Sequence, residues 1–453
     1  MILLGLAGAY FTLLVGGAGV ALLVLRASTR INLVECACLA WLFGVGVVSL
    51  LLWIGGTFSS GFALQSVVAL LCLVLGFFGW RVTQRPNVYL ALPRPNSRLE
   101  WILTAALLLE LLILFVVCLK HTLGWDGLLN WELKARYAFF NYGVPPGSYY
   151  SSPSRAFSHP EYPLAIPFTE LWLYLWMGEP NQFWIKTIFP LFYIAGAPLV
   201  ALFITRLTGK RWLGLLIALL IPFVPFVTVK PGGIIVGYVD IPLSVYYVAA
   251  LGYLLCALEC NLPFSFTAYA ASLTLIPWIK SEGVILWSLL ALIGLAAALY
   301  QHRLRAAILS TLPGLLLAVG WRCYLRVMHC VPPSDFSQPT IQLLSHNLSR
   351  LGTISSKAFA EITDTSGWST FWLLVLVAVI YLLVTRKPSR LLLVVAVVGP
   401  VALYPLIYVL STWPSYTAHL TSSLPRLFLH VMFAGWLAIG LALSPPKTQS
   451  GKI

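Results

Sequence analysis

Residues 100–119 read EWILTAALLLELLILFVVCL, an almost unbroken apolar run that ends where a polar, aromatic stretch, residues 120–183, begins. An α-helix needs about 20 apolar residues to cross the hydrocarbon core of a bilayer, and this run supplies them. Glu110 interrupts it near the middle. We therefore expect a transmembrane helix followed by a long loop that carries polar chemistry at the membrane surface.

The composition of the whole chain indicates the same class. Of its 453 residues, 60% are hydrophobic and only 9% are charged, and the mean hydropathy is +0.90. Soluble globular domains do not have this composition, whereas helical membrane proteins do. The net charge of +14 does not indicate a nucleic-acid partner, because the basic residues are scattered through short loops between apolar runs.

The apolar runs predict an all-α polytopic membrane protein with about 13 transmembrane helices. The expected spans are 2–25, 33–54, 62–80, 100–119, 184–205, 212–229, 241–258, 264–279, 284–301, 307–325, 368–385, 391–411 and 426–443. Residues 163–178 are apolar but short, and they contain Pro163, Pro167 and Glu170. We expect them to form a juxtamembrane helix that lies in the interface.

The distribution of charge predicts the orientation of these spans. With 163–178 not crossing, the basic residues of the short loops fall on one side, which is cytoplasmic by the positive-inside rule. These residues are Arg26, Arg30, Arg81, Arg85, Arg94, Arg98, Arg206, Lys210, Arg211, Arg303, Arg305, Arg386, Lys387, Arg390, Lys447 and Lys452. Most acidic residues then fall on the outer side: Asp126, Glu132, Glu161, Glu170, Glu179, Asp240, Glu282, Asp335, Glu361 and Asp364.

The first outer loop contains GWDGLLNWELKARYAFFNYG, residues 124–143. Asp126 has two interpretations there: the N-cap of a short helix that ends before Gly143, or a carboxylate that faces a cavity as a base or metal ligand. Glu132 and Arg136 of the same helix, and His159 further along the loop, are candidate substrate-binding residues. Glu132, Lys134 and Arg136 have the alternative of pairing with one another.

Three further segments bring ionisable residues to the same side. Asp240 begins a span in GYVDIPLSVYY, with the alternative that it only caps that helix. Lys280 and Glu282 join two spans with almost no loop between them, where a simple hairpin ion pair is the alternative. His419 and Arg426 lie in HLTSSLPRLFLH at the start of the last span. Arginine is the natural partner of a phosphate, although an interfacial anchor is the other reading of Arg426.

In order and spacing these segments resemble the GT-C superfamily of membrane glycosyltransferases, which use polyprenyl-phosphate sugars, and within it the aminoarabinose transferase and protein mannosyltransferase group. The resemblance covers residues 100–443 and rests on Trp125-Asp126, WELKARY, HPEYPLAIPFTELWLYLWMG, GYVDIPLSVYY, WIKSEG and HLTSSLPRLFLH. It implies a GT-C-like core at 100–325. The residues themselves predict an outer loop at 326–367 with an amphipathic helix, and C-terminal spans with a short cytoplasmic tail at 368–453. Three N-terminal spans at 1–99 have no assigned role.

The resemblance also implies roles for individual residues. Asp126 matches the catalytic base, Asp240 a second acid that lines the site, and Lys280 and Arg426 the groups that contact the donor phosphate. Many members carry paired acids in the first loop, whereas Gly127 follows Asp126 here. That departure leaves the binding of a divalent metal open, and no other cofactor is implied.

The expected function is an inverting transfer of sugar from a polyprenyl-phosphate donor to a lipid, glycan or protein acceptor, at the extracytoplasmic face of the cell (inner) membrane. The expected partners are this donor, the acceptor and membrane lipids, with no nucleic acid. Two alternatives are a glycan ligase that uses a lipid-diphosphate donor, and a transporter or flippase of lipid-linked precursors. A transporter requires polar groups at mid-membrane and broken helices.

Overall fold

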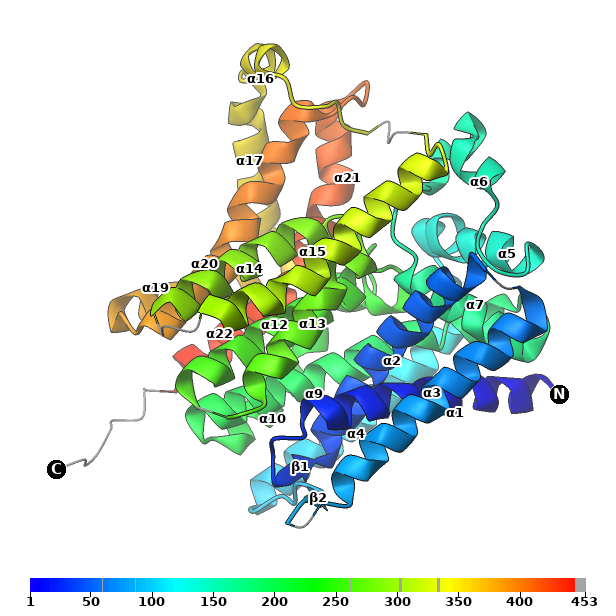
Figure 1. Ribbon diagram of the computed structural model, residues 1–453. Coiled ribbons are helices and arrows are strands. Elements are labelled where there is room, and N and C mark those ends of the chain that lie inside the picture. The colour runs from blue at the N-terminus through cyan, green and yellow to red at the C-terminus, as the bar shows by residue number, and fades with distance from the viewer. Residues whose placement is uncertain (59, 86, 261, 301–303, 332–334, 445–453) are drawn as a thin grey trace.

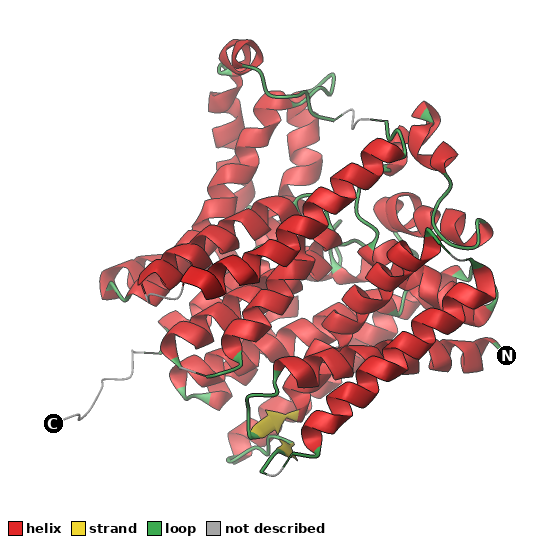
Figure 2. Cartoon of the chain, viewed as in Figure 1, coloured by secondary structure: helices red, strands yellow, loops and turns green. Residues whose placement is uncertain are grey.

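The computed structural model describes residues 1–444 except 59, 86, 261, 301–303 and 332–334. Within these residues the chain is almost wholly helical (Figures 1 and 2). Eight helices are long and apolar enough to cross a membrane, and a bent pair near the C-terminus makes a ninth if it is counted as one span. The chain is therefore a multi-pass membrane protein, and about 13 spans exceeds what the described helices support.

The first three helices of the chain pack together in a layer, and a short parallel strand pair lies at one end of it. The elements of this N-terminal region are α1 (Ile2–Val24), β1 (Arg30–Asn32), α2 (Leu33–Gly56), α3 (Gly61–Thr83), β2 (Tyr89–Ala91) and α4 (Arg98–Lys120). Asn32 caps α2 by accepting from the backbone N–H groups of Val34 and Glu35. α1 packs against both α2 and α3.

The polar segment after α4 folds into short helices at the end of the bundle. These are η1 (Gly127–Glu132), α5 (Leu133–Phe140), α6 (Gly147–Ser151), η2 (Pro153–Ser158), α7 (Ala165–Met177) and α8 (Gln182–Ile185). The helix predicted at 163–178 is α7. It has 13 residues, ends at Gly178 in the left-handed conformation, and is too short to span. Most of its side chains are buried, since it packs against α1, α2 and α5.

The remaining chain builds the larger part of the bundle around α12, in whose apolar window 94% of the residues are buried. The elements up to α15 are α9 (Ile188–Thr208), α10 (Arg211–Leu220), η3 (Ile221–Phe223), α11 (Pro225–Thr228), η4 (Ile234–Val236), α12 (Asp240–Glu259), α13 (Ser265–Ile279), α14 (Gly283–Tyr300) and α15 (Leu304–Val327). They are followed by α16 (Ile341–Asn347), α17 (Arg350–Ile362), α18 (Thr365–Trp368), α19 (Phe371–Thr385), α20 (Pro388–Leu403), η5 (Tyr404–Leu410), α21 (Tyr416–Leu429) and α22 (Met432–Ala442).

Several predicted spans are shorter or more broken than expected. The span predicted at 212–229 is divided into α10, η3 and α11, where Pro222 and Pro225 remove backbone donors and favour new helix starts. The helices α13 and α19 are 15 residues long. The span predicted at 426–443 is the bent pair α21 and α22, whose axes differ by 49°. The count of 13 spans is therefore not confirmed, since four of the described apolar helices have 10–17 residues.

Three of the loops that the charge pattern groups as cytoplasmic, at 25–32, 84–97 and 209–210, lie together at the end of the bundle that holds β1 and β2 (Figure 1). The strand pair joins 30–32 to 89–91, and Arg211 donates to the carbonyl oxygens of Arg94 and Pro93. There the buried Glu35 carboxylate accepts two hydrogen bonds from Arg206, at 2.6 Å each. Arg303, Lys447 and Lys452 lie outside the described residues.

Close packing of α1 on α2 gives a test of this layer. A Cβ atom at Gly17 would lie 1.9 Å from the carbonyl oxygen of Ala40, so Gly17→Ala should force the helices apart and cost about 1–3 kcal/mol. At Gly352 in α17 nothing lies within 4 Å of an added Cβ. Gly352→Ala should therefore leave the melting temperature in detergent unchanged or raised. Equal melting temperatures for the two variants would contradict this packing.

Candidate active site

Asp126 lies at the point where α4 gives way to η1, pressed against the loop that precedes α12. The N–H of Gly124 donates to the carbonyl oxygen of Val236 at 2.8 Å, and this contact holds the two loops together. Asp126 has helical backbone angles, and its side chain makes no capping hydrogen bond. The helix-cap reading of Asp126 is therefore wrong. Its Oδ2 instead accepts a hydrogen bond from Arg426 Nη2 of α21 at 2.5 Å.

Asp240 is the first residue of α12 and is completely buried. Its side chain caps no helix, so the capping alternative is wrong here also. Oδ1 accepts from Lys280 Nζ at 2.8 Å and lies 2.9 Å from Nε2 of His430, while Oδ2 accepts from Arg426 Nε at 3.1 Å. One carboxylate thus joins α12, α21 and the turn between α13 and α14.

The backbone before α12 is shaped to admit these side chains. Gly232 has φ +95°, a region that disfavours any other residue. A Cβ there would lie 2.7 Å from Leu429, 3.1 Å from Arg426 and 3.3 Å from Asp240. The glycine therefore allows the loop to approach both members of the Arg426–Asp240 pair.

Lys280 and Glu282 complete the cluster across the tight turn. Lys280 Nζ lies 3.0 Å from Glu282 Oε1, so the predicted hairpin ion pair exists, but the same ammonium also binds Asp240. Burial lowers the pKa of Lys280, and the carboxylates of Asp240 and Glu282 outweigh it, so the net shift is upward. Burial raises the pKa of Glu282, but the positive charge of Lys280 has the larger opposite effect, so the net shift of this pKa is downward. Both groups are charged at neutral pH.

We call Asp126, Asp240, Lys280, Glu282, Arg426 and His430 the ionic network. It holds three carboxylates against two fixed cations. Charges taken out of water are costly unless each is paired and hydrogen-bonded, and every carboxylate here has a cationic partner. Among the described residues, no group of three or more His, Cys, Asp or Glu side chains is arranged to hold a metal ion.

Aromatic rings wall the ionic network on several sides. The guanidinium of Arg426 lies 4.6 Å from the ring centroid of Tyr238. Tyr162 donates to Glu282 at 3.4 Å and stacks between Trp131 and His159, with ring centroids 5.4 and 4.9 Å away. These rings limit the contact of the charged groups with water, which strengthens the interactions between the charges.

The structure brings Asp126, Asp240, Lys280, Glu282 and Arg426 together, and leaves the other four sequence candidates outside the network. Glu132 forms an ion pair with Arg136 at 2.7 Å and accepts a hydrogen bond from Tyr174. The alternative prediction that these two charged residues pair with each other is therefore confirmed. His159 is separated from the network by the ring of Tyr162, on which it stacks, and its Nδ1 lies 3.2 Å from Oε1 of Glu161.

His419 points elsewhere, within 2.9 Å of Ser411 Oγ and stacked on Trp413. The sequence reasoning missed His430, Tyr162 and Tyr238. His430 follows Arg426 by one helical turn, and that spacing was the available signal.

Lys134 and Glu170 form a second buried polar region beside the network. Lys134 is fully buried and donates to the carbonyl oxygens of Asn130 and Ser158, at 2.6 and 2.8 Å, not to an acid. Burial lowers the pKa of Lys134 to about 7, although Glu161 and Asp126 act in the opposite direction. Both oxygens of Glu170 are buried without a hydrogen-bond partner, and burial holds its pKa well above the usual range.

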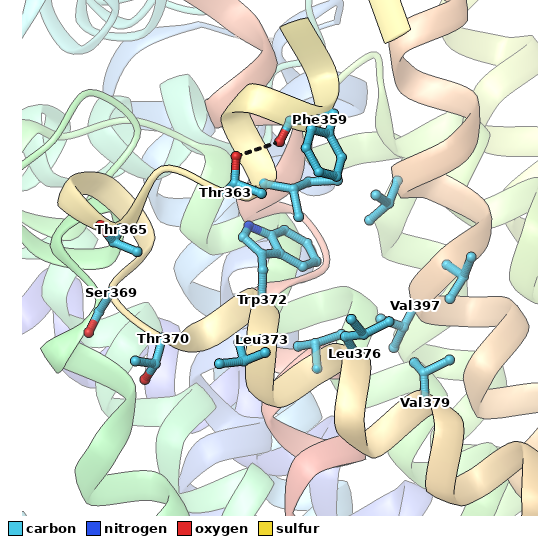
Figure 3. A pocket seen from close by; sticks show the side chains of 14 residues that line it. Phe359, Thr363, Thr365, Ser369, Thr370, Trp372, Leu373, Leu376, Val379 and Val397 are labelled. Atoms are coloured by element: carbon cyan, nitrogen blue, oxygen red, sulfur yellow. Dashed lines mark hydrogen bonds between the residues drawn. The ribbon is translucent and has the colours of Figure 1, made fainter. Parts of the chain in front are cut away.

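A separate apolar cavity of about 480 Å³ lies between α17, α18, α19 and α20. In Figure 3, Phe359, Trp372 and Val397 gather around it. None of the ionic network lines this cavity. The indole of Trp372, however, contacts Phe428 of α21 with ring centroids 5.6 Å apart, so one layer of side chains separates the cavity from the helix that carries Arg426.

The buried Lys134 should give stability a characteristic pH dependence. An unfolded lysine keeps its proton to about pH 10.4, whereas the folded one releases it near pH 7. Between these values the unfolded state binds more protons, so the free energy of unfolding rises with pH, by up to about 1.4 kcal/mol per unit. Lys134→Met should remove this rise. The melting temperature of the wild type should therefore increase relative to that of the variant between pH 7 and pH 10.

The exposed Lys357 on α17 provides the matched control, since Lys357→Met should follow the wild type across the whole range. A constant difference in melting temperature between wild type and Lys134→Met would show that Lys134 keeps an ordinary charge when folded.

A scan of protein-family models matches no family, and searches of curated proteins and of solved structures find no match to this chain. The functional inference therefore rests on the residues and their geometry.

Proposed function

We propose that the chain is an integral-membrane glycosyltransferase that moves a sugar from a polyprenyl-phosphate donor to an acceptor hydroxyl. The observation that carries the proposal is the Arg426 guanidinium held between Asp126 and Asp240, with Lys280 on the far side of Asp240. Two fixed cations and a carboxylate that is partly accessible are the groups that such a transfer requires. With the β1 and β2 end cytoplasmic, the network faces the extracytoplasmic side of the inner membrane.

In this proposal the donor phosphate competes with Asp126 for Arg426. While Arg426 donates to Oδ2 of Asp126, that oxygen is occupied and is not free to accept a proton from an acceptor hydroxyl. The guanidinium fork suits phosphate at least as well as carboxylate. When the phosphate takes over Nη2, Asp240 still holds Nε. Arg426 therefore keeps its orientation while Asp126 is released as a base, so donor binding precedes base activation.

The transfer is then a single displacement. The acceptor oxygen attacks the anomeric carbon, the bond from that carbon to the phosphate oxygen breaks, and polyprenyl phosphate leaves with the electron pair. Asp126 accepts the hydroxyl proton, and the configuration at the anomeric carbon inverts. A positioned base contributes about 10²–10⁴ to the rate, and stabilisation of the developing phosphate charge by Arg426 contributes a similar factor.

The apolar cavity beside α21 supports a lipid-linked donor. It has room for a hydrocarbon chain, and its lining is nearly all apolar. Trp372 joins it to Phe428, two residues beyond Arg426. A prenyl chain in this cavity would bring its phosphate toward the network through the aromatic layer.

One observation favours the transporter alternative. The helix that carries Arg426 breaks by 49° before α22, and broken helices that present charged groups are typical of transporters. A glycan ligase that acts on a lipid diphosphate would use the same cations. The experiment therefore needs arms that separate all three.

Purified protein in liposomes is given a panel of polyprenyl-phosphate sugars and acceptor lipids, and the product is followed by mass spectrometry. We expect sugar transfer that falls about 10²–10⁴-fold in Asp126→Asn, with donor binding retained. Arg426→Gln should lose donor binding as well. The exposed Glu179→Gln serves as the matched control and should keep full activity.

Transfer that survives Asp126→Asn unchanged would refute the assigned base. Movement of intact donor across the liposome without covalent product would favour the transporter, and activity restricted to diphosphate donors would favour the ligase.

A further inference from the structure

Glu110 is an acidic residue in the middle of α4, 16 positions before Asp126 in the sequence, and the proposed transfer does not use it. Tyr193 of α9 donates a hydrogen bond to its Oε1 at 2.9 Å. Its Oε2 is buried without a hydrogen-bond partner among the described residues. A carboxyl group in the middle of an apolar helix costs free energy when one of its oxygens has no hydrogen-bond partner, and ionisable groups in membrane spans are candidates for functional sites.

Glu110 lines a groove of about 380 Å³ between α4 and the broken segment α10, η3 and α11. The other lining residues are Ala106, Leu109, Ile113, Leu114, Leu219, Pro222, Phe223 and Thr228. Leu109 and Phe223 are 58% and 69% exposed, and both lie on helices apolar enough to sit in the bilayer. The groove therefore opens sideways toward lipid, not toward water.

The chemistry of the lining defines the occupant. Among the described residues that line the groove there is no Lys or Arg, so an anionic headgroup would meet the Glu110 carboxyl without a cation to hold it. An ammonium headgroup would have to leave water for the hydrocarbon depth of the groove, which is expensive. A neutral hydroxyl headgroup needs no cationic partner and carries no charge that must leave water. It can hydrogen-bond to the carboxyl of Glu110 and to the Thr228 hydroxyl. The volume is at the small end of ligand pockets, which fits one hydrocarbon chain.

We propose that this groove is a binding site for a single-chain membrane lipid with a neutral hydroxyl headgroup, such as a free lipid alcohol, held by Glu110. The site is independent of the ionic network and of the transferase proposal, because the two share no residue. The broken helix provides the groove, since Pro222 and Phe223 line it where α10 ends.

The test uses a photoreactive 16-carbon alcohol that carries a diazirine in its chain, with the full-length protein in phosphatidylcholine nanodiscs. Probes of equal length ending in a methyl, an amine or a phosphate are compared. The alcohol should label peptides of α4 and of η3–α11 at least fivefold more than the other probes. Glu110→Leu should reduce this labelling at least fivefold. Ala106→Trp, which fills the groove and retains the carboxyl, should do the same.

Glu179→Gln, at an exposed residue that does not line the groove, is the control and should label as the wild type does. Tyr193→Phe removes the hydrogen bond to Oε1 but keeps the acid, and should retain labelling, which separates loss of the site from misfolding. Equal labelling by the methyl probe, stronger labelling by the amine or phosphate probe, or full labelling of Glu110→Leu would each overturn the proposal.

Discussion

The Asp240 carboxylate is the interaction on which the described site depends. It is fully buried at the start of α12, the most enclosed candidate span, and has Arg426, Lys280 and His430 within hydrogen-bonding distance of its two oxygens. A buried carboxylate without cations would not stay ionised. Equally, Arg426 and Lys280 would not stay in this interior without Asp240. The partners fix the relative positions of α12, α21 and the turn between α13 and α14.

Arg426 contacts both Asp240, which is fully enclosed, and Asp126, which is partly accessible. Because the two carboxylates differ in exposure to solvent, we assign them different roles. Asp240 is expected to stay paired, because separating it from its partners would leave an uncompensated charge in the protein interior. Asp126 loses much less when Arg426 turns to a phosphate, because water can reach it. The proposed order of events, with donor before base, follows from that asymmetry.

Local sequence pattern predicted the helical class, the short helix α7 and five members of the ionic network. Those predictions depend on hydrophobic run length and on charge at helix ends, which are local properties. The two N-cap readings were wrong because Asp126 is bound by a residue 300 positions away, and no local pattern encodes that distance. Glu132 and Arg136 are one helical turn apart and bind each other. Likewise, the apolar run at 212–229 did not reveal that Pro222 and Pro225 divide it into α10, η3 and α11.

The central claim is that Arg426 binds the phosphate of a polyprenyl lipid. The most direct measurement is the relative affinity of the protein for polyprenyl phosphate and for the polyprenol of equal length, by native mass spectrometry from nanodiscs. The account predicts that the wild type prefers the phosphate at least tenfold. It also predicts that Arg426→Gln loses this preference while binding the polyprenol as before. Equal affinity of the wild type for the two lipids, or a preference that survives Arg426→Gln, would contradict it.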